Sequence, residues 1–269
     1  MMTSRMTSDQ TTPLTAHEQD TKTQAQLDSI SSEIKASQAL TSEPFPITEL
    51  SSLFEPSTNF QKGCNYLGTR YKYYRSIRGD GNCYYRAFLY SLCQKLYGEE
   101  EELQRVHAYV KSSIDTVERF GYDRFAVETF HEEMVDLLGS VASAESFAEI
   151  HEMLNEENGT SDYCVWYLRV ITAAYLKADA DRFIHFLDDP NYFDVETFCR
   201  REIDPMGRET TMVGVLALAE AFNVTVDIEY LDGRDMIHKK LVKHSFGNEG
   251  AALTLTMLYR PGHYEILYN

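Results

Sequence analysis

Residues 78–88 read RGDGNCYYRAF, and the two glycines of this stretch precede a cysteine at the expected start of an apolar helix. A cysteine at a helix N-terminus lies beside unpaired backbone N–H groups and the positive end of the helix dipole, which favour the thiolate. Gly79 and Gly81 allow the backbone before it to turn tightly, so that its amides can face a developing oxyanion. Cys83 is therefore the candidate nucleophile.

A cysteine nucleophile needs a base, and the base needs a third group that orients it. His263 and Glu265 are two residues apart in an expected strand that follows the turn Pro261-Gly262, so their side chains project from one face. Each residue alone has a structural explanation, because a helix-start cysteine is usually a packing residue and a histidine near a chain end is usually solvated. Together with Asp80, three positions before the cysteine, they indicate a cysteine hydrolase.

Hydrophobic periodicity predicts helices first and strands afterwards, which is an α+β class. The expected helices, of which the one from residue 161 has Ser161 as N-cap, cover residues 83–96, 100–121, 125–138, 147–154, 161–176, 195–203 and 211–222. Period-two alternation or an extended lead-in predicts strands at residues 71–77, 224–230, 253–259 and 263–268. The basic stretch 238–244, with two histidines and three lysines, is expected to be a solvated connection.

Composition narrows the classes of function. The chain has 269 residues, 43% of them hydrophobic, and a formal charge of −17, so nucleic acids and anionic membranes are expected to repel it. The acidity suits a basic protein partner or simply a solvated surface.

The five cysteines of the chain are scattered without a CxxC pair. They predict neither a disulfide framework nor a metal site, and no cofactor is expected. Without a signal-like N-terminus or a long apolar run, a reducing compartment follows, cytoplasmic or nuclear.

The first 42 residues are rich in Thr, Ser, Gln and Asp and contain no aromatic residue, so we expect a mobile polar arm. Leu27, Ile30 and Ile34 recur at helical spacing within it and predict a short amphipathic helix. This helix either orders on a partner or packs on its own domain. A single domain is expected over residues 43–269, with its core from about residue 72.

Four stretches resemble the ovarian-tumour (OTU) family of deubiquitinating cysteine proteases, in particular its otubain branch. They are GDGNCYYRA at 79–87, LYRPGHYEILY at 258–268, FCRREIDPMG at 198–207 and SDY at 161–163. The order of these stretches resembles that of the otubains over residues 43–269. The resemblance implies a papain-like α+β fold, with a small mixed or antiparallel C-terminal sheet packed between helical regions.

The resemblance also implies isopeptidase chemistry on ubiquitin and polyubiquitin conjugates, without a cofactor. Cys83 would be the nucleophile, His263 the base, and Glu265 the third member, at a position where otubains more often carry Asp or Asn. Asp80 would be the acidic residue of the cysteine loop, whose backbone at Gly81 and Asn82 would line the oxyanion hole. In this branch the implied substrate is polyubiquitin joined through the lysine at position forty-eight of ubiquitin.

One departure concerns residues 211–214, which read TMVG where otubains carry a more polar sequence. This difference leaves the catalytic residues untouched but affects their surroundings, so the linkage preference does not transfer directly. Two alternatives to the isopeptidase stay open. The first is a non-catalytic regulator that binds ubiquitin-conjugating enzymes through the N-terminal arm. The second is a cysteine acyltransferase on an unrelated fold.

Overall fold

The computed structural model describes residues 16–54, 58–187 and 190–269, which form two units that divide between Ser37 and Gln38. The first unit contains helix α1 (Ala16–Ser37), which is longer than the short helix expected around Ile30. Ile30 is exposed on it. The mobile arm predicted for the N-terminus lies, for residues 1–15, outside the described residues. The second unit begins before the expected boundary at residue 43.

One mixed sheet of six strands organises the second unit, in the order β1-β2-β6-β5-β3-β4. Neighbouring strands are antiparallel except for the parallel pair β3 and β5. The strands are β1 (Phe45–Pro46), β2 (Tyr73–Arg75), β3 (Thr225–Tyr230), β4 (Val242–Gly247), β5 (Thr254–Arg260) and β6 (His263–Tyr268). The α+β class with a small C-terminal sheet is confirmed, and two short strands from the N-terminal half extend the sheet at the β6 edge.

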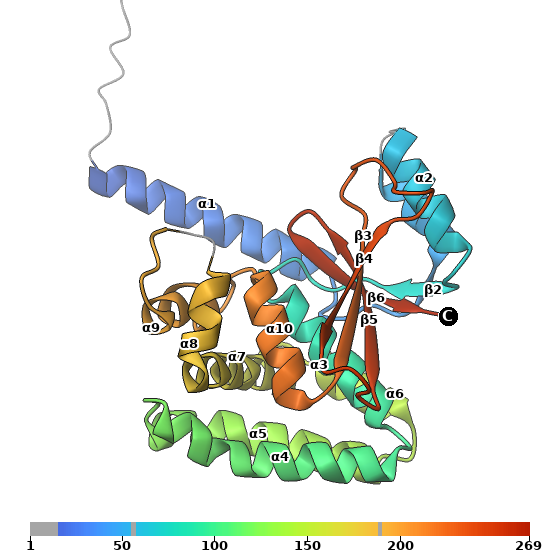
Figure 1. The fold of residues 1–269 in the computed structure, drawn as a ribbon. Coiled ribbons are helices and arrows are strands. Elements are labelled where there is room, and N and C mark those ends of the chain that lie inside the picture. Colours follow the sequence, from blue (N-terminus) through green and yellow to red (C-terminus); the bar gives the residue numbers. More distant parts are fainter. Residues whose placement is uncertain (1–15, 55–57, 188–189) are drawn as a thin grey trace, which may run out of the picture. The chain divides into compact units, whose positions relative to one another are not determined.

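Helices cover both faces of this sheet (Figure 1). They are α2 (Thr58–Gly68), α3 (Cys83–Leu96), α4 (Glu100–Arg119), α5 (Arg124–Ser143), α6 (Phe147–Leu154), α7 (Thr160–Ala178), α8 (Ala180–Phe183), α9 (Val195–Phe198) and α10 (Met212–Phe222). The 3-10 turns η1 (Ile47–Leu53) and η2 (Ile184–Phe186) and the π-helical turn η3 (Cys199–Ile203) complete the set. None of the described helices is long and apolar enough to cross a bilayer.

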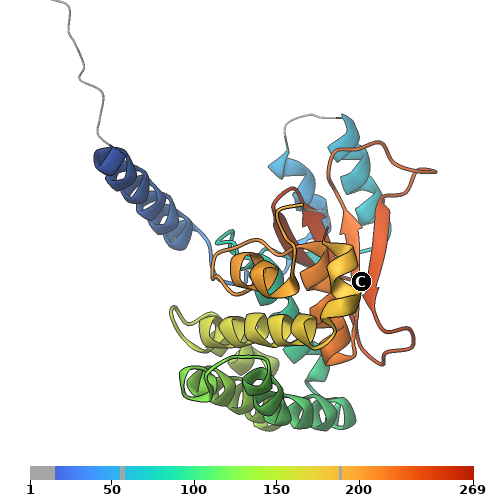
Figure 2. The same cartoon turned by 60° about the vertical axis from the view of Figure 1, so that its left-hand side comes forward.

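Helix α3 lies against strands β5 and β6 on one face and against α7 on the other (Figures 1 and 2). Nearly all of its side chains are buried. Phe88, fully buried, meets Phe222 of α10 edge to face with ring centroids 5.4 Å apart. Burial of such a side chain stabilises the fold by roughly 1.5–3 kcal/mol. The helix that begins at Cys83 is therefore fixed along its whole length, directly beside strand β6.

Three local predictions were wrong. Strand β4 occupies part of the stretch expected to be a connection, because its side chains are largely exposed and polar and so lack an apolar alternation. The expected helix 195–203 is interrupted, since α9 gives way to η3 at Cys199. Ser161 is not an N-cap, because α7 begins at Thr160 after Gly159, and the Ser161 hydroxyl instead accepts a hydrogen bond from Arg86 at 2.9 Å.

Candidate active site

Cys83 is the first residue of α3, and its side chain is buried. The loop before it depends on Gly81, whose φ of +76° favours glycine. A Cβ on Gly81 would also lie 2.0 Å from the carbonyl oxygen of Gly207. The cysteine loop is thus packed directly against the loop at residues 204–211, and only glycine fits at the contact.

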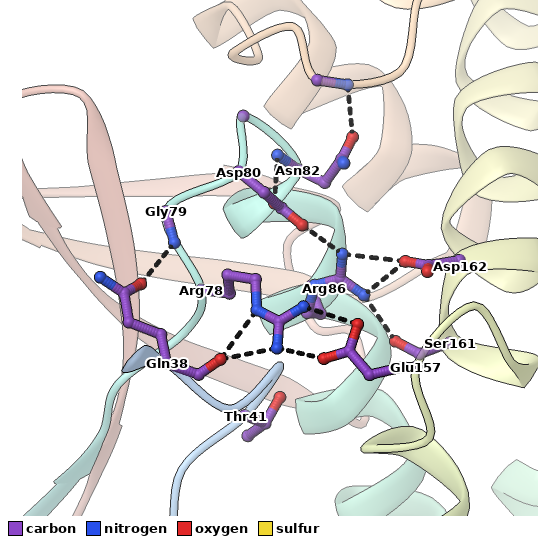
Figure 3. A network of polar contacts seen from close by, with 12 residues as sticks. Gln38, Thr41, Arg78, Gly79, Asp80, Asn82, Arg86, Glu157, Ser161 and Asp162 are labelled. Atoms are coloured by element: carbon purple, nitrogen blue, oxygen red, sulfur yellow. Dashed lines mark hydrogen bonds and ion pairs between the residues drawn. The ribbon is translucent and has the colours of Figure 1, made fainter. Parts of the chain in front are cut away.

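Asp80 holds the cysteine loop through its side chain. Its Oδ1 accepts a hydrogen bond from the Asn82 backbone amide at 2.9 Å, and its Oδ2 accepts one from Arg86 Nη2 at 2.6 Å. Arg86 is buried and also donates to Asp162 of α7 at 3.1 Å (Figure 3). The carboxylate of Asp80 is therefore occupied in tying the loop to α3 and α7. The Asn82 amide is already donated to Asp80, whereas Cys83 is the first residue of the helix.

Arg169 is a site residue that the sequence analysis missed. Its guanidinium is buried in α7 and donates to Gly81 O at 3.1 Å, Asn82 Oδ1 at 2.8 Å, Ile203 O at 2.9 Å and Arg208 O at 2.7 Å. Asn82 Oδ1 also accepts from the Gly207 amide at 2.9 Å. These bonds connect the cysteine loop to residues 203–208. In the sequence, this role could have been suspected from the position of an arginine within the apolar stretch that forms α7.

His263 and Glu265 lie at the start of β6, as the alternation predicts. His263 Nε2 is 3.9 Å from Glu265 Oε1, and the fully buried Glu265 accepts a shorter hydrogen bond, 2.6 Å, from Arg260 Nη2. The other ring nitrogen, Nδ1, lies 3.8 Å from the point that a Cβ on Gly79 would occupy. The imidazole is thus bounded by Glu265 on one side and by the cysteine loop on the other. Cys83 in turn receives a backbone hydrogen bond from Tyr264, the residue between His263 and Glu265.

Burial dominates the protonation of this site. It raises the pKa of the Cys83 thiol to about 11, an effect that a backbone hydrogen bond from Tyr264 opposes and the carboxylate of Asp80 reinforces. It lowers the pKa of His263 to about 4, with the nearby Arg260 cation adding to the shift and Asp80 opposing it. The Tyr84 amide in the first turn of α3 favours the thiolate, as expected for a helix N-terminus, but burial outweighs it. At neutral pH the free protein holds a thiol and a neutral imidazole.

The departure at residues 211–214 has a structural explanation in part. The Thr211 hydroxyl accepts a hydrogen bond from the Gly214 amide at 3.2 Å and caps α10. A Cβ on Gly214 would lie 2.7 Å from the Thr210 hydroxyl oxygen and 3.1 Å from Ile203 Cδ1. The two residues therefore set the start of α10 close to the loop that carries Gly207. Nothing in the structure explains Met212, which is half exposed.

Comparisons with known proteins identify the family of this chain. Residues 33–269 match the family model of the otubain peptidases, peptidase family C65. The chain belongs to the otubain family. No group of three or more histidine, cysteine or acidic side chains among the described residues is arranged to hold a metal ion.

Two named otubains are among its relatives. Ubiquitin thioesterase OTUB1 of Homo sapiens is 36% identical over 245 residues, which cover 91% of this chain and 88% of that protein. Ubiquitin thioesterase OTUB2 of Mus musculus is 30% identical over 209 residues, or 78% of this chain and 86% of that protein.

A solved otubain structure also resembles this chain. It is described as h/ceOTUB1 with ubiquitin aldehyde and UBCH5B~Ub, and it superposes with a TM-score of 0.86 at 26% identity over 94% of this chain and 99% of that one. A second, with UBC13~Ub, gives a TM-score of 0.85 at 26% identity, covering 93% and 98%. The otubain fold therefore extends over the whole second unit.

Proposed function

We propose that this otubain is a deubiquitinating cysteine protease that hydrolyses isopeptide bonds in ubiquitin and polyubiquitin conjugates. The observation that carries the proposal is the placement of Cys83 at the start of α3, within hydrogen-bond reach of the Tyr264 backbone, between His263 and Glu265 of β6. A protein that only bound ubiquitin would need no such nucleophile and base. The relatives named ubiquitin thioesterases support the substrate.

In the proposed reaction the sulfur of Cys83 attacks the carbonyl carbon of the C-terminal glycine of ubiquitin. The thiol proton passes to the imidazole of His263, which is unprotonated at neutral pH because burial lowers its pKa to about 4. The C–N bond then breaks, the imidazolium protonates the leaving lysine amine, and water hydrolyses the remaining thioester. The Cys83 amide at the open end of the helix donates to the developing oxyanion.

Glu265 has a limited part in this scheme. Its carboxylate lies 2.6 Å from Arg260 Nη2 but 3.9 Å from His263 Nε2. It therefore orients the imidazole by charge across this longer distance and not through a short hydrogen bond. Burial raises the pKa of Glu265, and the Arg260 cation opposes that shift. We therefore assign Glu265 as the third residue of the catalytic site, after Cys83 and His263, and Arg260 as the cation that pairs with its carboxylate.

Cleavage of diubiquitin joined through the lysine at position forty-eight of ubiquitin tests the proposal. We expect the wild-type protein to release monomeric ubiquitin and the variants Cys83→Ala and His263→Ala to release none. Cys93→Ala is the matched control, because Cys93 is a second cysteine of α3 that is fully buried in the core. Cleavage that persists in Cys83→Ala would disprove the assignment of the nucleophile.

A second function, binding to ubiquitin-conjugating enzymes, is favoured by α1. This helix presents Ile30 with 46% of its surface exposed, and an exposed apolar side chain on a helix suits docking on a partner. The otubain structures described with UBC13~Ub and UBCH5B~Ub support the class of partner. We propose it as a function of this protein in addition to the hydrolase activity.

We expect Ile30→Asp to weaken binding to a ubiquitin-charged conjugating enzyme at least tenfold, measured by titration calorimetry. Ser32→Asp is the control, because at about 100° per residue it places the same charge on nearly the opposite side of the helix. Equal affinities of the wild-type protein and Ile30→Asp would remove α1 from the interface.

We also propose that the protein resides in a reducing compartment, the cytoplasm or the nucleus. Its five cysteines are all free and buried, which supports this location. Fractionation of cells that express the tagged protein would test it, and recovery in the secreted fraction would contradict it.

A further inference from the structure

The segment that follows α1 pairs with the lead-in to the cysteine loop. Leu40 O accepts a hydrogen bond from the Arg78 amide at 3.1 Å, and the Ser42 amide donates to Ser76 O at 2.9 Å. Between them, Thr41 and Ile77 form an antiparallel bridge. Residues 40–42 therefore run beside residues 76–78 like a short additional strand, although they lie within the stretch that the sequence assigns to the arm.

Gln38 continues this pairing to the base of the loop. Its backbone carbonyl accepts from Arg78 Nε at 2.9 Å and from Nη2 at 2.6 Å, and its side-chain Oε1 accepts from the Gly79 amide at 3.0 Å (Figure 3). Arg78 is nearly fully buried and pairs on its other side with Glu157. One residue thus binds both the last side chain before the loop and the first amide of the loop.

The same side chain and the imidazole of His263 both approach Gly79. The position of a Cβ on Gly79 is 3.9 Å from Gln38 Oε1 and 3.8 Å from His263 Nδ1. The amide oxygen and the ring nitrogen therefore border the same glycine. A change of charge at Gln38 should reach the imidazole, and loss of its acceptor should release the Gly79 amide next to Asp80.

We propose that Gln38 is a positioning residue of the active site, which holds the cysteine loop through Gly79 and fixes the place of the loop beside His263. It acts on catalysis through these residues and needs no contact with substrate. Asp80 and Arg86 restrain the loop from the side of α3 and α7, and Gln38 restrains it from the side of β2. The effect on turnover rests on the proposed hydrolase function, whereas the effect on the imidazole does not.

Two variants of the full-length protein separate the acceptor from the charge. Gln38→Leu removes the acceptor of the Gly79 amide, and Gln38→Glu keeps it while adding a carboxylate near His263. Ser42→Ala is the matched control, because the Ser42 hydroxyl accepts the Ser76 amide at 2.9 Å in the same segment but away from the loop. Hydrolysis of a fluorogenic C-terminal amide of ubiquitin gives kcat and KM, and NMR titration of the His263 ring gives its pKa.

We expect Gln38→Leu to lower kcat about five- to tenfold with little change in KM, which is the effect of one lost hydrogen bond expressed in a rate. Gln38→Glu should keep most of kcat and raise the pKa of His263, so that the acidic limb of the pH–rate profile moves to higher pH. Ser42→Ala should match the wild-type protein in both measurements.

Wild-type kcat in Gln38→Leu, or an equal loss in Gln38→Leu and Ser42→Ala, would overturn the proposal, as would an unchanged imidazole pKa in Gln38→Glu. If the wild-type protein itself failed to hydrolyse the ubiquitin amide, the proposed function would fail. The shift of the His263 pKa would then still decide whether Gln38 lies beside the imidazole.

Discussion

Replacing Arg169 by methionine should separate the cysteine loop from the loop that it packs against. The methionine keeps much of the apolar stem but removes donors to four oxygens, which belong to Gly81, Asn82, Ile203 and Arg208. A hydrogen bond from a charged donor contributes about 1.5–3 kcal/mol, and an unpaired buried acceptor costs about 1–3 kcal/mol.

Part of this contribution is offset in the wild-type protein, because burial disfavours the charged guanidinium and lowers the pKa of Arg169. We therefore expect Arg169→Met to lower the free energy of unfolding by about 3–5 kcal/mol, the usual cost of breaking a buried charged network. Total stabilities are about 5–15 kcal/mol, so a folded fraction should remain to be assayed.

Urea unfolding and diubiquitin cleavage, measured on the same samples, test the expectation. Below the unfolding transition, Arg169→Met should cleave at least a hundredfold more slowly than the wild-type protein, and Arg169→Lys should lie between them because lysine keeps the charge without the planar fork. Arg200→Met is the control, since Arg200 is exposed and bonds only weakly to Thr197, at 3.4 Å. Arg169→Met with wild-type cleavage and stability within 1 kcal/mol of wild type would refute the link between the loops.

The remaining predictions follow from burial and from the loop contact. Alkylation of Cys83 by iodoacetamide should rise about tenfold per pH unit from pH 7 to 10, because its pKa is about 11, and a plateau below pH 9 would contradict this. Between pH 6.5 and 4 the wild-type protein should lose up to roughly 3 kcal/mol of its free energy of unfolding, and a His263→Gln variant should keep it. The reason is that His263 takes up a proton near pH 6.5 in the unfolded chain but only near pH 4 in the folded protein. Identical pH–stability curves would disprove that. Gly81→Ala should lower the free energy of unfolding more than Gly98→Ala. Both glycines have a positive φ, but a Cβ on Gly81 would also lie 2.0 Å from the backbone oxygen of Gly207, whereas one on Gly98 would meet nothing. Equal losses of stability in the two variants would exclude the clash.

Local patterns were sufficient to predict where the candidate site residues lie in the fold. The two-residue spacing of His263 and Glu265 predicts that they share a face of β6, and the strand begins at His263 as expected. The glycines before Cys83 predict a tight loop at the start of a helix, and Gly81 has the positive φ that such a loop needs. In each case the determining interactions lie within a few residues of one another in the sequence.

Features that depend on distant contacts could not be predicted in this way. Arg169 donates to backbone oxygens 34 to 88 residues away, and no local pattern marks such acceptors. The pKa of Cys83 depends on how deeply packing buries the thiol, and this burial outweighs the helix terminus that the sequence reveals. Strand β4 was missed because it lies at the sheet edge with exposed side chains, which removes the alternation that identifies a strand.

The central claim is that the thiol at the start of α3 attacks the C-terminus of ubiquitin. Reaction with ubiquitin that carries a C-terminal electrophile, followed by peptide mapping of the adduct, tests it most directly. We predict one covalent adduct, on Cys83 and on none of the other four cysteines, which depends on His263. An adduct on another cysteine, or none under conditions in which other otubains react, would contradict the account.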